Sequence, residues 1–179
     1  MNRELVSFPP KTAPRELYLI GFHLDPAAEG SQFYTLIGYG DSGEQPITQD
    51  GRVLLFRNPA DGLKALIASD NGFSDLRTVP EELELMCDIS GALYVANAEN
   101  ADTEGVLFEL IAVFDDLLRA VKLNVPAEYA VVLSAVAERL GENPEFASFL
   151  EERELSREKL EDALMWCVGA VAVKSSWVG

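Results

Sequence analysis

The spacing of apolar positions changes along this chain, from short runs typical of strands in the first half to a helical period in the second. Aromatic and β-branched residues dominate 16–24 and 32–40, and 52–57 contains a continuous apolar run. These stretches predict strands of an antiparallel meander, because such residues pack well on a sheet. The polar stretch 40–51 predicts a loop, and 75–79 predicts a short fourth strand.

The period becomes helical over 59–69. Asn58 is suited to the position before a helix and Pro59 to its first turn. Asn71 and Gly72 tolerate the left-handed backbone conformation that often ends a helix. We expect this helix to lie on one face of the sheet.

The second half of the chain predicts a helical bundle, because its apolar residues recur every three or four positions. Helices are expected over 80–97, 103–122, 126–140, a short segment starting at 143–144, and 156–173. Ser156 is the expected cap of the last one. Gly91 disfavours the first, so a strand over 92–96 is the alternative there.

Strands followed by helices predict an α+β fold. We expect an antiparallel sheet of three to four strands with one helix on it in the N-terminal half, and the helical bundle in the C-terminal half. Residues 1–16, rich in proline, predict an extended arm. Residues 17–179 then form one domain, with a sheet-rich layer at 17–79 and a helical layer at 80–179.

Charge alters the functional picture, because 14 bases stand against 30 acids and the net charge is −16. Residues 1–80 carry seven bases and ten acids, whereas residues 81–179 carry seven bases and twenty acids. No lysine or arginine lies between Arg77 and Arg119. Such a surface disfavours nucleic acid and anionic lipid. A basic protein partner suits it better, although an acidic face can also serve solubility alone.

Six carboxylates of the second half form the candidate binding face: Glu81, Glu82, Glu84, Asp88, Asp115 and Asp116. On a helix over 80–97, Glu84 would share a face with Glu81 and with Asp88, and such like charges invite a cation or a basic partner. Asp115 and Asp116 lie with Glu109 on the next helix, away from its apolar stripe.

A calcium-binding loop is a weak alternative at residues 100–111. Asn100, Asp102 and Glu104 match the first three ligand positions of an EF-hand, and Gly105 matches its glycine. The twelfth position, which needs a bidentate glutamate, is Ile111. A turn in which Asp102 caps the following helix explains the same residues, so no metal site is assigned.

Other catalytic groups are scarce. His23 is the one histidine, and although Asp25 lies two residues away, no nucleophile stands in a recognisable motif. Cys87 and Cys167 lie in apolar runs, which predicts two buried thiols. Neither a zinc motif nor a phosphate-binding glycine loop is present, and no cofactor is indicated.

The N-terminus lacks the apolar core of a signal peptide, and the longest apolar run, 163–173, is too short to span a bilayer. These features predict a cytoplasmic protein. Trp177, close to the C-terminus, would indicate docking onto the domain or onto a second chain if exposed.

The first functional hypothesis is a non-enzymatic binding or regulatory protein that presents its acidic helical face to a basic protein partner. The alternative is an enzyme using carboxylates with Mg²⁺ or Ca²⁺, centred on Glu84, Asp88 and Asp115. A self-associating scaffold is the third hypothesis.

Overall fold

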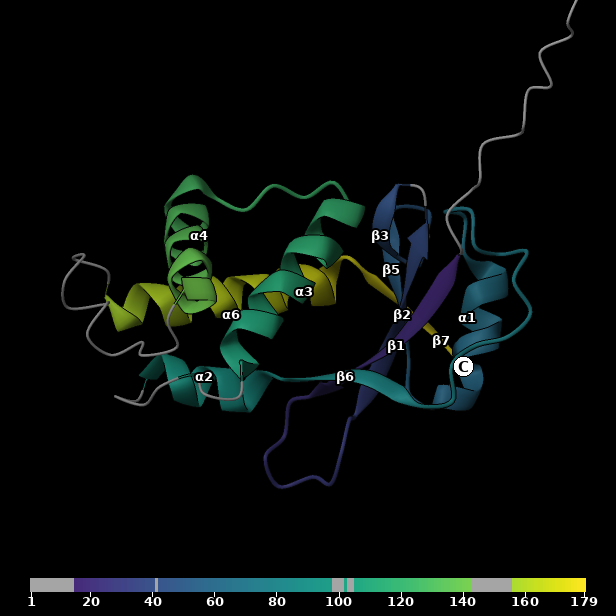
Figure 1. Ribbon diagram of the computed structural model, residues 1–179, viewed down its shortest axis with the longest axis horizontal. Coiled ribbons are helices and arrows are strands. Elements are labelled where there is room, and N and C mark those ends of the chain that lie inside the picture. Colours follow the sequence, from purple (N-terminus) through teal and green to yellow (C-terminus); the bar gives the residue numbers. More distant parts are fainter. Residues whose placement is uncertain (1–14, 41, 98–101, 103–104, 143–155) are drawn as a thin grey trace, which may run out of the picture.

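The computed structural model describes residues 15–40, 42–97, 102, 105–142 and 156–179 of the chain. Within these residues, seven strands form one mixed sheet (Figure 1). The strands are β1 (Glu16–His23), β2 (Phe33–Gly40), β3 (Gly43–Pro46), β4 (Thr48–Gln49), β5 (Arg52–Phe56), β6 (Leu83–Asp88) and β7 (Ser175–Val178).

The sheet runs in the order β4-β5-β2-β1-β6, with β3 paired to β2 and β7 paired to β5. β1 pairs antiparallel with β2, as the meander predicts, and β5 also pairs antiparallel with β2. The two pairings made by the C-terminal half are parallel: β6 lies beside β1, and β7 lies beside β5.

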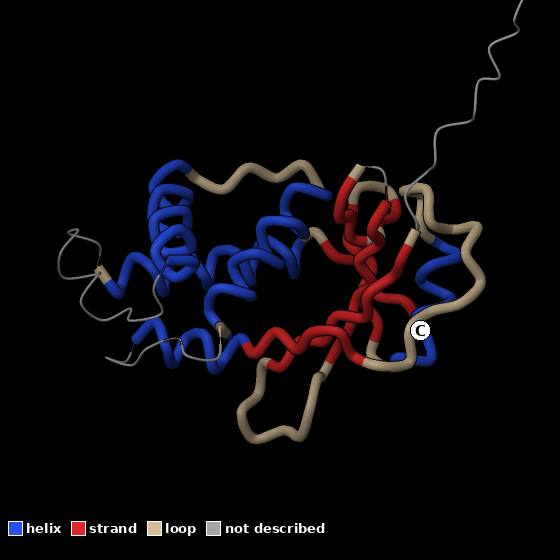
Figure 2. The backbone as a smooth tube through the Cα atoms, viewed as in Figure 1, coloured by secondary structure: helices blue, strands red, loops and turns tan. Residues whose placement is uncertain are grey.

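The described helices are η1 (Pro59–Asp61), α1 (Gly62–Ala68), α2 (Ile89–Asn97), α3 (Val106–Ala120), α4 (Ala127–Glu142) and α6 (Arg157–Val173). Figure 2 shows the strands separating α1 from α2, α3, α4 and α6. The Ser156 hydroxyl accepts a hydrogen bond from the Lys159 backbone N–H at 3.1 Å, which is the cap expected for α6.

Side chains on the two faces of the sheet belong to two separate hydrophobic cores. In β1, Leu19 belongs to the core beside α1, whereas Ile20 and Phe22 belong to the core beneath the other helices. We call these the α1-side core and the helical core. This alternation follows from the two-residue period of a strand. The expected α+β fold is confirmed, and among the described helices α1 packs on the face opposite α2, α3, α4 and α6.

The segment 40–51 is not the loop that its polar residues predict, because β3 and β4 lie within it. Asp50 and Gly51 both adopt positive φ, 52° and 70°. Such a two-residue turn folds Thr48 and Gln49 back onto β5 in a hairpin. The sheet therefore has more than the three to four strands expected.

The prediction of a helix over 80–97 is also wrong for the first half of that segment. Residues 83–88 form β6, and only Ile89–Asn97 form α2. Leu85 and Cys87 are partly or fully buried and alternate with the exposed Met86, and the edge of β1 is available to pair with this segment. The alternative strand at 92–96 is wrong too, because those residues are helical.

Residues 75–79 form no strand, since this part of the chain connects α1 to the far edge of the sheet. The arm expected at 1–16 lies outside the described residues except for Arg15 and Glu16, and Glu16 already begins β1. The short helix expected from 143 lies outside them too. Every helix within the described residues is too short or too polar to cross a bilayer.

Candidate functional site: an acidic groove between α3 and the sheet

A groove of about 470 Å³ lies between α3 and the sheet. Its floor is apolar and includes Ile20, Ile37, Leu85 and Val113. Carboxylates from both halves of the chain line it as well: Glu44, Glu84, Glu109 and Asp116. We call this feature the acidic groove.

Local structure explains why Glu84 reaches the groove. Leu19 pairs with Leu83 and Ile20 pairs with Leu85, so that Glu84 is the extra residue of a β-bulge. A bulge redirects a side chain that would otherwise alternate with its neighbours. Glu84 and Leu85 therefore line the same groove although they are consecutive in a strand.

The residues that α3 contributes to the groove follow the helical period. Glu109, Val113 and Asp116 are spaced i, i+4 and i+7, which places them on one stripe of the helix. Val113 is buried against the sheet, while Glu109 and Asp116 flank it and are only half-buried. Glu44 lies opposite on β3, beside the end of β2.

Two carboxyl groups of the groove, those of Glu109 and Asp116, lie in an environment that disfavours their charged form. Partial burial raises the pKa of Asp116; Arg119 opposes the rise, and the nearby Glu44 and Asp115 add to it. Burial also raises the pKa of Glu109, with a further contribution from Asp102. Both effects follow from the cost of desolvating a carboxylate and placing it near others.

Tyr18, which also lines the groove, is affected by the nearby carboxylates. Its hydroxyl donates a hydrogen bond to Glu16 Oε2 at 2.8 Å. That hydrogen bond, then burial, and then the charges of Glu16, Glu84 and Glu44 raise the pKa of the phenol. A cation placed in the groove would relieve this repulsion.

Lysine and arginine are missing from the described residues that line the groove. Arg119, one turn further along α3, contacts Asp115 at 2.6 Å and Asp116 at 2.7 Å. It therefore offsets part of the negative charge at one end. Glu44, Glu84 and Glu109 form no ion pair that the structure shows within its described residues.

The six acids chosen from sequence are divided by the structure. Glu84 and Asp116 meet in the groove, whereas Glu81 and Glu82 are exposed in the connection before β6. Asp115 is exposed on α3 and pairs with Arg119. The shared helix face expected for Glu81, Glu84 and Asp88 is wrong, because 83–88 is a strand.

Asp88 has a structural role at the start of α2. Its Oδ1 accepts hydrogen bonds from the Gly91 backbone N–H at 2.9 Å and from the Ser90 hydroxyl at 3.0 Å. A side chain added at Gly91 would place its Cβ 2.5 Å from the Asp88 carboxylate. Gly91, which weakened the prediction of a helix here, therefore makes room for the cap that starts it.

Sequence reasoning missed Glu44 and did not select Glu109. The stripe shared by Glu109 and Asp116 was readable from their spacing on α3. Glu44 could not be placed, because its segment was expected to be a loop and the approach of β3 to α3 is a tertiary feature.

Of the three candidate calcium ligands in the loop that resembles an EF-hand, Asp102 alone is described, and its carboxylate is hydrogen-bonded to the backbone. Asp102 is only 4% exposed. Its two carboxylate oxygens accept the backbone N–H groups of Leu107, at 3.2 Å, and Phe108, at 3.0 Å. Asn100 and Glu104 lie outside the described residues. Across the part of the chain that is described, no three His, Cys, Asp or Glu residues are grouped to hold a metal ion.

The two cysteines and Asp25, which the sequence offered as possible reactive groups, are buried or hydrogen-bonded within the fold. Cys87 and Cys167 are buried free thiols, as expected, and burial raises the pKa of Cys87 to about 12 and that of Cys167 to about 11. Both therefore stay protonated near neutral pH. Asp25 accepts the backbone N–H of Ala27 at 2.9 Å, so its carboxylate stabilises a local turn beyond His23.

Comparisons with known proteins bear on the fold alone. Neither a protein-family model nor a curated protein sequence matches the chain. Among solved structures, the fold is similar to that of the SatS C-terminal domain, crystallised in complex with bromine. The TM-score is 0.52 at 14% sequence identity, and the match covers 90% of this chain and 93% of that one. The similarity supports the mixed α+β architecture over most of the chain.

Proposed function

We propose that this protein is a non-catalytic binding module that receives a lysine- or arginine-rich segment of a partner protein in the acidic groove. The observation that supports the proposal is the convergence of Glu44, Glu84, Glu109 and Asp116 on an apolar floor without a lysine or arginine among the described lining residues. A purely solubilising surface does not require such convergence.

The two kinds of lining residue contribute differently to binding. Exposed ion pairs are worth at most about 1 kcal/mol each, so the carboxylates chiefly speed encounter and select basic partners. Ile20, Ile37 and Val113 are only 4 to 6% exposed, so they shape the floor of the groove but offer little area to a ligand. Leu85 and Phe108 keep exposed surface and supply apolar contact, at about 25 cal/mol for each Å² removed from water. Long lysine or arginine side chains suit both, because their stems are apolar and their ends are charged.

The charge of the groove also selects the class of partner. Nucleic acids and anionic membrane surfaces bind through cationic side chains, which the described lining residues lack. A basic protein segment instead gains from the negative charge of neighbouring carboxylates, which adds to the effect of burial in raising the pKa of Glu109 and Asp116.

The test is calorimetric binding of a peptide of alternating lysine and alanine at low salt. In the triple variant Glu44→Gln, Glu84→Gln, Asp116→Asn, we expect affinity to fall roughly tenfold to a hundredfold, as the loss of three partly exposed ion pairs implies. The loss should shrink at higher ionic strength, because exposed pairs are screened.

A charge-matched control variant distinguishes binding in the groove from attraction by the overall negative charge of the protein. Glu128→Gln, Glu138→Gln, Glu158→Gln removes three exposed carboxylates of α4 and α6 that do not line the groove. This variant should bind nearly as the unaltered protein does. Equal weakening in both triple variants would show that net charge alone attracts the peptide, and the proposal would fail.

The second candidate is a carboxylate enzyme that uses a divalent cation, and the raised pKa values of Glu109 and Asp116 favour it, since perturbed groups cluster at catalytic sites. The centre expected from the sequence is dispersed, because Glu84 lines the groove, Asp88 caps α2 from the end of β6, and Asp115 is exposed on α3 and paired with Arg119. Stabilisation by Mg²⁺ or Ca²⁺ that is lost in the groove triple variant would support the enzyme over the binding module.

A further inference from the structure

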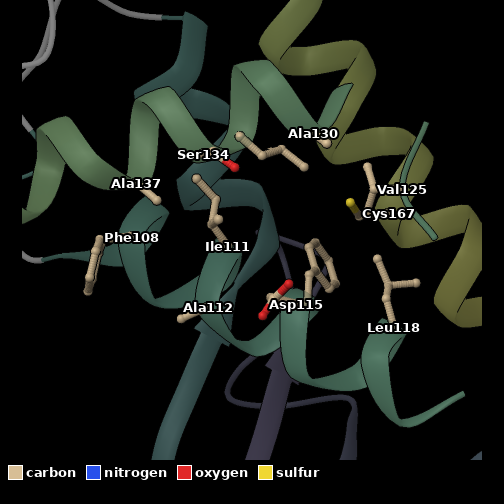
Figure 3. A pocket seen from close by; sticks show the side chains of 12 residues that line it. Phe108, Ile111, Ala112, Asp115, Leu118, Val125, Ala130, Ser134, Ala137 and Cys167 are labelled. Atoms are coloured by element: carbon tan, nitrogen blue, oxygen red, sulfur yellow. The ribbon is translucent and has the colours of Figure 1, made fainter. Parts of the chain in front are cut away.

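A second hollow lies on the other side of α3, between α3, α4 and α6, with a volume of about 380 Å³ (Figure 3). Its lining is predominantly apolar and includes Ile111, Leu118, Val125 and Leu133. Figure 3 shows Phe108 at one end and the sulfur of Cys167 at the other. We call this hollow the three-helix pocket.

The pocket and the acidic groove meet on the surface of α3. Phe108 and Ala112 line both hollows, and they lie one helical turn apart. Phe108 is 40% exposed and Ala112 is exposed as well. A bound chain can therefore pass from one hollow to the other over the small side chain of Ala112.

The chemistry of the pocket limits what it can take. Ala130 and Ala137 on α4 leave space where larger side chains would fill it. Burial and the nearby Asp115 keep the Cys167 thiol uncharged, with a pKa of about 11. Asp115 and Ser134 supply the polar groups of the lining, and no lysine or arginine occurs among its described residues. A fatty acid or another anionic ligand would find no cation for its head group.

We propose that the three-helix pocket receives one bulky aliphatic side chain, leucine or methionine, from the same basic segment that occupies the acidic groove. This inference rests on the proposed function and sharpens it: the preferred ligand is a lysine- or arginine-rich segment with an apolar anchor, lying across α3 over Ala112. Charge then directs the segment to the protein, and the anchor selects among basic sequences.

The test compares two peptides, the alternating lysine–alanine peptide and the same peptide with one central alanine replaced by leucine. Burying the larger side chain should make the leucine peptide bind about tenfold more tightly to the unaltered protein. Ala137→Phe, which fills the pocket from a partly buried position, should abolish that advantage and leave the affinity for the lysine–alanine peptide unchanged. Ala137→Ser, close in size to the original residue, should retain it.

A second filling variant, Ser134→Phe at an exposed position of α4, guards against misfolding of Ala137→Phe and should give the same result. If the leucine peptide binds no more tightly than the lysine–alanine peptide, and the latter still binds, the proposal of an anchor in the three-helix pocket fails while the proposed function stands. The anchor is also overturned if the advantage persists in both phenylalanine variants. If neither peptide binds the unaltered protein, the proposed function fails together with the anchor.

Discussion

The two faces of the sheet differ in how their carboxylates are partnered. Near α1, Asp61 lies 2.6 Å from Lys64, and Asp75 lies 2.7 Å from Arg15. These hydrogen-bonded cations lower the pKa of both carboxyls. In the acidic groove on the opposite face, by contrast, partial burial and neighbouring acids raise the pKa of Glu109 and Asp116.

This contrast separates acids that are held in ion pairs near α1 from Glu44, Glu84 and Glu109, which form no ion pair among the described residues. The Arg15 guanidinium lies 5.2 Å from the ring centre of Phe73 and also pairs with Asp75, so it joins the start of β1 to the connection after α1. No comparable cation lies among the described residues that line the groove. The unfavourable gathering of acids there is what a basic ligand would relieve.

Two glycines differ in their surroundings, since Gly38 lies against the α1-side core and Gly169 lies on the exposed side of α6. A Cβ at Gly38 would lie 2.5 to 2.7 Å from the Phe73 ring in the α1-side core, whereas a Cβ at Gly169 on α6 would meet nothing within 4 Å. Gly38→Ala should therefore lower the free energy of unfolding by about 1–3 kcal/mol through overpacking. Gly169→Ala should raise it by up to about 1 kcal/mol, because alanine favours a helix.

Urea unfolding of the two variants at one pH measures both effects. If Gly38→Ala proved neutral, Phe73 would have to move without cost, and the closely packed description of the α1 face would be wrong. A loss in Gly169→Ala would contradict the open surroundings of α6 at that position.

The pH dependence of stability should carry opposite signs for the two sets of acids. A carboxyl group whose pKa is raised by folding contributes stability at low pH, and this stability is lost as the pH rises through the pKa of the folded state. Protonation of Glu109 and Asp116 should therefore stabilise the fold as the pH falls from 7 toward their ordinary pKa values of 4.5 and 3.8. Because both groups are partly exposed, the gain is under about 1 kcal/mol. Asp61 and Asp75 have lowered values, so their contribution is present above 3.8 and is lost below it.

Paired variants assign each part of that profile. Glu109→Gln with Asp116→Asn should flatten the change between pH 7 and the carboxyl range, and Asp61→Asn with Asp75→Asn should flatten the loss in acid. Unfolding free energies measured across this range would contradict the comparison if the first pair altered only the acid loss.

Much of the fold was predictable from local pattern, and the failures have physical causes. β1, β2, β5, α3, α4 and α6 are long or strongly periodic, so their sequences alone favour one structure. The Asp50–Gly51 turn also had a local signal, since Asp-Gly between potential strands is typical of a tight hairpin, but the polar residues around it favoured a loop.

The two strands from the C-terminal half could not be found in this way. β6 depends on β1 as a parallel partner, and β7, four residues long, depends on β5, more than a hundred residues earlier in the chain. Trp177 on β7 is 56% exposed, yet it packs edge-on against Phe33. It therefore docks onto its own domain, one of the two outcomes expected of an exposed tryptophan there.

The candidate site shows the same limit. Glu84 and Asp116 were selected because they are acidic residues in a stretch without cations. Their convergence required the β6 bulge and the docking of α3 on the sheet, neither of which has a local signature. Glu44 lines the groove because its segment forms β3, which lies beside α3.

The most direct test of the acidic groove is methyl NMR of the full chain during titration with the alternating lysine–alanine peptide. Methyl signals of Ile20, Ile37, Leu85 and Val113 report on the groove floor, and those of Ile47 and Leu66 report on the α1-side core. We predict saturable shifts of the first set and none of the second. Shifts confined to the α1 face, or spread equally over both faces, would contradict a binding site between α3 and the sheet.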